Sequence, residues 1–182
     1  MELRDKVAAE RRRLREVRQA LSAAVAQGSQ GASAWVSFYL AIGDYFAAAM
    51  HRLHVQDVRM GDLLRQRADL STPKATVAMQ ELQDRLDGNQ RLLDRFMLCH
   101  AGLKTQGAAT LPAFESAARD YTNFITTNMG HHDGTTSLAR DAFTTEDWEY
   151  MALTSDSDAE REGVLYGEVF SKLPDNLVLP EA

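Results

Sequence analysis

The stretch Ala117–Trp148, AARDYTNFITTNMGHHDGTTSLARDAFTTEDW, combines a helical pattern of apolar residues with two adjacent histidines and an acid-rich ending. The earlier segment Ala41–Asp57, AIGDYFAAAMHRLHVQD, repeats its Ala, Asp, Tyr and Asp in the same spacing. Two long helices with matched residues indicate a duplicated helical hairpin whose halves face each other in a bundle. The sequence therefore predicts a helical fold organised around these two segments.

Apolar residues recur every three or four positions along most of the chain, which is typical of amphipathic helices. Four long helices are predicted at residues about 3–27, 32–67, 73–101 and 112–140, with a loop at 102–109 and short helices at about 145–153 and 164–173. Ser71 or Thr72 is expected to cap the third helix, and Thr144 the first short one, because their oxygens accept hydrogen bonds from free N–H groups. The prediction is an all-α, up-and-down four-helix bundle with short C-terminal helices.

Length and composition fit one soluble globular domain. The chain has 182 residues, of which 45% are hydrophobic and 25% charged. We expect residues 1–173 to form the bundle and residues 174–182, which show no clear period, to form a loosely held tail. The single cysteine, Cys99, cannot form an internal disulfide, so the cytoplasm is the expected location.

The charge pattern excludes two classes of partner. A formal charge of −6 argues against nucleic acid, which requires a basic face. The basic run Arg11–Arg13 has acids interleaved around it, which indicates a solvated helix face. No apolar run reaches the roughly 20 residues that a membrane span needs, and the charged N-terminus does not resemble a secretory signal. We therefore expect no nucleic-acid partner and no membrane partner.

Several segments together resemble the hemerythrin-like family, also called the HHE cation-binding family. The residues that carry the resemblance are Met50–His54, Tyr121, Phe124, Met129–Asp133, Leu138–Ala139, Phe143–Trp148 and Val164–Gly167. The resemblance implies a four-helix bundle around a non-haem di-iron site. Such a site takes one His from each of two helices and a His-x-x-x-Glu pair from each of the other two, since residues i and i+4 share a helix face.

The ligand positions implied by this resemblance carry other residues here. They are occupied by Arg11, by Arg52 and Gln56 (or His51 and Val55 if the register shifts by one residue), by Asn89 or Gln90, and by Asn128 and His132. No register recovers the family's ligand set. The expectation is therefore a divergent member whose usual di-iron centre is absent.

Two hypotheses for function follow. In the first, Arg52, Gln90 and Asn128 line a small internal pocket that binds an anion or a small polar molecule, because a buried Arg without a partner would be costly. The protein would then be a small-ligand-binding, sensory or interaction module that forms homo-oligomers, rather than an enzyme.

In the second hypothesis, the chain binds iron, zinc or another divalent metal through re-sited ligands. His51, His54, His132 and Asp133 are the candidates, and Asp57 is an alternative carboxylate. The resemblance implies that such a metal could handle dioxygen or nitric oxide. The competing interpretation is that these are ordinary helical histidines, partly exposed to solvent.

Other residues invite simpler interpretations. His100 is expected to cap the end of the third helix through the helix dipole. Tyr45 and Tyr121 are expected to pack in the core, and Asp44 and Asp120 to face outward. No phosphate loop, dinucleotide fingerprint or serine elbow is present in the sequence. An enzymatic role is therefore the least favoured interpretation.

Overall fold

The computed structural model describes residues 3–128 and 133–180, and every regular element in these ranges is helical. The elements are α1 (Leu3–Gln27), the 3-10 helix η1 (Ser33–Trp35), α2 (Val36–Arg67), α3 (Pro73–Gln106), the 3-10 helix η2 (Gly107–Thr110), α4 (Leu111–Asn128), α5 (Asp133–Ala142), α6 (Thr145–Ala152) and α7 (Asp156–Ser171). The all-α prediction is confirmed.

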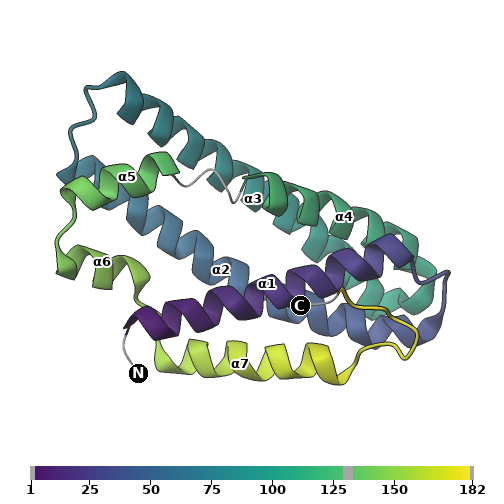
Figure 1. The fold of residues 1–182 in the computed structure, drawn as a ribbon. Coiled ribbons are helices and arrows are strands. Elements are labelled where there is room, and N and C mark those ends of the chain that lie inside the picture. Colours follow the sequence, from purple (N-terminus) through teal and green to yellow (C-terminus); the bar gives the residue numbers. More distant parts are fainter. Residues whose placement is uncertain (1–2, 129–132, 181–182) are drawn as a thin grey trace.

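The chain turns back after α1, after α2 and after α3, so that α2, α3 and α4 each return past the helix before them (Figure 1). Helix α3 makes its most extensive contacts with α4 and α2, and α1 packs against α4. Helix α7 returns along the outside of α2 and also touches α1. A C-terminal helix is therefore part of the helix packing and not an appendage.

Two predicted helix starts are confirmed. The Thr72 side chain accepts a hydrogen bond from the Ala75 N–H, and Pro73 occupies the first turn, where its missing N–H costs nothing. Thr144 opens α6 with a reciprocal capping box, in which its hydroxyl accepts from the Asp147 N–H and the Asp147 carboxylate accepts from the Thr144 N–H.

Three predicted boundaries differ from the structure. Helix α3 continues to Gln106 through the predicted loop at Gly102, since one glycine weakens a helix by only about 1 kcal/mol. The chain leaves the helix at Gly107, whose φ of 61° is the left-handed conformation that favours glycine. Helix α7 begins at Asp156, because Ser155 caps it and acids fill its first turn.

The third difference concerns the predicted helix at 112–140. The structure has two helices there, α4 ending at Asn128 and α5 beginning at Asp133. The Met129–His132 segment, which carries part of the family resemblance, lies outside the described residues.

Aromatic side chains fill the core at the end of the molecule where α1 gives way to α2 and α3 to α4. The Phe46 ring lies 5.9 Å from the Tyr121 ring, and the Tyr39 ring lies 4.9 Å from the Phe114 ring, measured between centroids. Helices α2 and α4 thus meet across this core, as the matched segments suggest. Tyr45 and Tyr121 are fully buried, which confirms their predicted packing role.

Residues 174–180 are more closely packed than the sequence predicts. Pro174 is buried, and Leu177 and Leu179 pack against the core. The Gln27 amide donates to the Asn176 carbonyl oxygen over 2.8 Å and accepts from the Val178 N–H over 3.3 Å. The end of α1 therefore holds this segment in place, and the segment itself makes a turn in which the Leu177 N–H donates to the Pro174 carbonyl oxygen.

Candidate functional site

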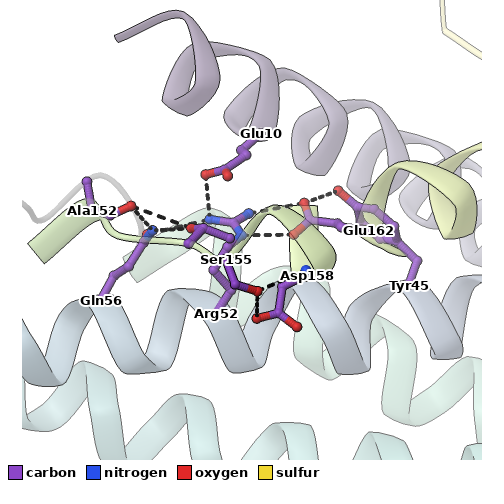
Figure 2. A network of polar contacts seen from close by, with 9 residues as sticks. Glu10, Tyr45, Arg52, Gln56, Ala152, Ser155, Asp158 and Glu162 are labelled. Atoms are coloured by element: carbon purple, nitrogen blue, oxygen red, sulfur yellow. Dashed lines mark hydrogen bonds and ion pairs between the residues drawn. The ribbon is translucent and has the colours of Figure 1, made fainter. Parts of the chain in front are cut away.

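A buried network of charged residues, which we call the Arg52 network, joins α1, α2 and α7 (Figure 2). The Arg52 guanidinium pairs with both oxygens of Glu162, Nε to Oε2 at 2.8 Å and NH2 to Oε1 at 3.1 Å. Its NH1 lies 3.1 Å from Oε2 of Glu10. The side chains of Arg52, Glu10 and Glu162 are only 9%, 8% and 3% exposed. One guanidinium thus bridges two carboxylates from two other helices.

Neutral groups complete the Arg52 network. The Tyr45 hydroxyl donates to Glu162 Oε1 over 3.3 Å. The Gln56 carbonyl oxygen lies 3.5 Å from Arg52 NH1, and its amide nitrogen donates to the Ala152 carbonyl oxygen and to the Thr154 hydroxyl. The network therefore also fixes the connection between α6 and α7, beside the Ser155 cap visible in Figure 2.

Helical periodicity explains why α2 can supply three members of this network. Tyr45, Arg52 and Gln56 are seven and four residues apart, so they share one face of the helix. Glu162 and Val169, which are seven apart on α7, are both buried against the bundle. The stripe that packs α7 onto α2 is thus apolar at one end and charged at the other.

The burial of this network shifts the pKa values of its members. Burial raises the pKa of Glu10, and the neighbouring Glu162 charge raises it further against the opposing effect of Arg52. Burial alone would lower the pKa of Arg52, but its hydrogen bonds and charge contacts with Glu162 and Glu10 raise it. The pKa of Tyr45 is raised by burial and by the Glu162 charge. The guanidinium is therefore held charged, whereas burial opposes the ionisation of Glu10.

A second buried polar layer joins α2, α3 and α4. Arg85 Nε and NH2 lie 3.1 and 3.3 Å from the two carboxylate oxygens of Asp57. The Tyr121 hydroxyl donates to Asn89 Oδ1 over 2.8 Å, and burial raises the pKa of Tyr121. Asp57 is thus engaged with Arg85 and is not a free metal ligand.

The three residues predicted to share a polar pocket bond to three different sets of partners. Arg52 belongs to the buried network described above. Gln90 is exposed and donates to Asp94 on its own helix, and Asn128 donates to the carbonyl oxygen of Phe124 one turn earlier. The inward position predicted for α3 is taken by Asn89 instead of Gln90.

The predicted metal ligands are also distributed. His51 is exposed, and His54 is partly buried with an Nδ1 that has no hydrogen-bond partner in the described part of the chain. Asp133 is exposed at the start of α5, and His132 lies outside the described residues. Within residues 3–128 and 133–180, no three His, Cys, Asp or Glu side chains gather around a point that could hold a metal ion.

His100 does not have the role predicted for it. Because α3 extends to Gln106, His100 lies before the last turn, where it is buried against Gly43 of α2. Its Nε2 lies 3.1 Å from the Leu40 carbonyl oxygen and 3.5 Å from Asp44 Oδ1. His100 therefore links α3 to α2 across a close helix contact. As predicted, Asp44 and Asp120 are exposed.

The sequence analysis missed Glu10 and Glu162. Glu10 stands beside the basic run of α1, where its charge was assigned to a solvated face, and Glu162 lies just before the residues 164–173 that were predicted to form the last helix. One signal was present: Arg52 stands on the same face of α2 as Tyr45, and a buried guanidinium requires buried carboxylate partners.

Comparisons with known proteins returned no match among family models, curated proteins or solved structures. In the part of the chain that the structure describes, no helix is both long enough and apolar enough to span a membrane.

Proposed function

We propose that the protein is a divergent hemerythrin-like, up-and-down four-helix bundle that works without the family's di-iron centre, as a small-ligand-binding or interaction module. The alternating directions of α1 to α4 and the capped Thr144–Trp148 segment support the family part of the proposal. The cytoplasmic location and the homo-oligomeric state stay predictions of the sequence.

The Arg52 network is the observation that carries this proposal. Arg52 stands at a position where the resemblance implies a metal ligand, and its guanidinium holds Glu10 and Glu162 together. Two carboxylates that converge in a buried site require a cation, and here the Arg52 side chain supplies it. Gln56 and Asn128, at two further ligand positions, also bond to protein groups.

The same network supports a non-catalytic role. Its carboxylates are directed at Arg52 and its tyrosine hydroxyl at Glu162. A general base or nucleophile must reach a substrate, whereas these groups are almost fully covered by the protein. Cross-linking of helices is the function that this geometry suits.

Elemental analysis of the untagged protein, produced in medium supplemented with iron and zinc, tests the proposal. We expect each metal to be well below one equivalent per chain. Stoichiometric iron, accompanied by the near-ultraviolet absorption of an oxo-bridged pair, would overturn it. The Arg52→Lys variant serves as a control, because it keeps a cation in the network and should also lack metal.

A single observation favours the second candidate, a metal-binding protein with re-sited ligands. The buried Nδ1 of His54 lacks a partner among the described residues, and a metal ion would satisfy it. If this candidate holds, His54→Ala and His132→Ala must each lower the bound metal. Unchanged metal content in both variants would exclude it.

A further inference from the structure

A groove of about 360 Å³ runs between α2 and α3, on the flank of the bundle away from the Arg52 network. Val58 and Leu86 supply its apolar surface, and the polar groups are those of His54, Arg65, Gln83, Asp87 and Gln90. Gly61 adds no side chain to this surface. The volume falls within the range of small-ligand sites, and two residues predicted separately, His54 and Gln90, meet here.

Hydrogen bonds along α3 decide which atoms the groove offers. Gln83 Nε2 donates to Asp87 Oδ1 over 2.9 Å, and Gln90 Nε2 donates to Asp94 Oδ1 over 2.8 Å. A carboxylate only accepts, so each amide must turn its NH2 group toward the carboxylate. The carbonyl oxygens of Gln83 and Gln90 are left as acceptors, and Asp87 adds a third.

The charges of the groove also favour a ligand that donates hydrogen bonds. Arg65, the basic residue of the groove, is paired with Asp62 through NH1 at 3.0 Å. Asp87 makes no ion pair with a Lys, Arg or His side chain in the described part of the chain. The groove therefore combines a carboxylate of uncompensated charge with neutral acceptors, an arrangement that attracts a cation carrying hydrogen-bond donors.

We propose that this groove binds a small organic ammonium ion, with its nitrogen among the Asp87, Gln83 and Gln90 oxygens and its alkyl chain along Val58 and Leu86. An ammonium group has three N–H donors to match these acceptors. The proposal rests on the proposed function, since it names the ligand class of a small-ligand-binding module. The apolar residues favour an alkylammonium over a hydrated metal ion, because an alkyl chain can pack against them and a shell of water molecules cannot.

Calorimetric titration of the full-length protein with 1,4-diaminobutane at constant ionic strength tests the proposal. We expect saturable binding at one site per chain, and no binding of the uncharged analogue 1,4-butanediol. Asp87→Asn should weaken the binding at least about tenfold, because it removes a charge-assisted hydrogen bond. Asp84→Asn is the matched control: Asp84 accepts from Gln80 in the same i, i+4 geometry on α3, outside the groove, and its loss should change nothing.

The proposal would be overturned by no saturable binding of the diamine, by equal binding of the diol, or by equal weakening by Asp84→Asn and Asp87→Asn. Binding of zinc or magnesium that depends on Asp87, without binding of the diamine, would also overturn it. The metal content of the purified protein is measured separately. A metal-free protein that does not bind the diamine would contradict the groove proposal but not the proposed function. Stoichiometric iron would contradict the proposed function.

Discussion

Two neighbouring regions of the helix bundle are held together in different ways. In the first, Phe46, Phe96, Phe114 and Tyr121 form a continuous set of ring contacts between α2, α3 and α4. In the second, the Arg52 network joins α1, α2 and α7 by charge. Aromatic packing tolerates changes that conserve volume, whereas removing the cation of a buried ion network leaves its carboxylates uncompensated.

We therefore expect the aromatic region to tolerate substitutions, and the Arg52 network to favour one arrangement of the helices. The rings stabilise any arrangement that excludes water and fills the same volume. A buried guanidinium fixes one register of α7 on α2, because sliding either helix by a turn would leave charges unpaired. We therefore expect the Arg52 network to set the alignment of α7 on α2.

Removal of Arg52 is expected to have the largest effect. Arg52→Ala leaves Glu10 and Glu162 buried without a cation, which should lower the free energy of unfolding by about 3–5 kcal/mol. Chemical denaturation monitored by circular dichroism measures the change. The matched control is Arg95→Ala, which removes an exposed pair with Asp120 and should cost no more than about 1 kcal/mol.

Equal effects of the two arginine variants would contradict this comparison. If Arg52→Ala does not fold, the neutral combination of Arg52→Met, Glu10→Gln and Glu162→Gln provides a second test. It should fold, since no unpaired charge is buried. Because α7 then lacks its ion pair with α2, its amide hydrogens should exchange faster than in the wild type.

Loss of the Tyr121 hydroxyl is expected to have an intermediate effect. Tyr121→Phe keeps the ring contacts but leaves the buried Asn89 Oδ1 without its donor, which should cost about 1–3 kcal/mol of unfolding free energy. Tyr150→Phe, at an exposed position, is the control and should be nearly neutral. A neutral Tyr121→Phe would mean that the polar layer between α3 and α4 contributes nothing beyond ring packing.

Neutralisation of Glu10 is expected to have the smallest effect, and in the opposite direction. Because burial raises the pKa of Glu10 in the folded protein, ionising it costs stability, and this cost appears as the pH rises through that raised pKa. Glu10→Gln keeps an acceptor for Arg52 and removes the charge. At neutral pH it should stabilise the protein, by less than Tyr121→Phe destabilises it.

The pH dependence of stability tests the sign of this effect. The advantage of Glu10→Gln over the wild type should shrink as the pH falls toward about 4, where Glu10 becomes protonated in both folded and unfolded chains. Glu168→Gln, in an exposed pair with Lys172, is the control and should show no such advantage at neutral pH. A Glu10→Gln variant that is less stable than the wild type at neutral pH would contradict the assigned cause of the shift.

Local features of the fold could be predicted from the sequence, and long-range partners could not. The end of α1 at Gln27 and the caps at Thr72 and Thr144 follow from residues within one turn of each boundary. Gly102 and Gly107 are both possible helix-terminating residues in the sequence. Only Gly107 ends a helix, because of the two only Gly107 takes a positive φ. Local patterns cannot show which of two neighbouring glycines the chain will use.

The candidate site depends on partners far apart in the chain. The sequence indicates that Arg52 needs a carboxylate, but it does not indicate which one. Its partner Glu162 is 110 residues away, and the sequence predicts the last helix to begin only at residue 164, after Glu162. Likewise, Asn89 and Gln90 could not be told apart, since which of them faces Tyr121 depends on how α3 is rotated in the bundle. These assignments depend on how helices pack and not on their own periodicity.

The most direct test of the central claim, that a buried guanidinium takes the place of a metal in tying these helices together, is thermal unfolding at three metal conditions. The melting temperature should be the same with excess chelator, with ferrous iron under anaerobic conditions and with zinc. A ligand that binds only the folded state raises the melting temperature, and the rise grows with the logarithm of the ligand concentration once that exceeds the dissociation constant. A melting temperature that falls with chelator and rises again with either metal would contradict the account.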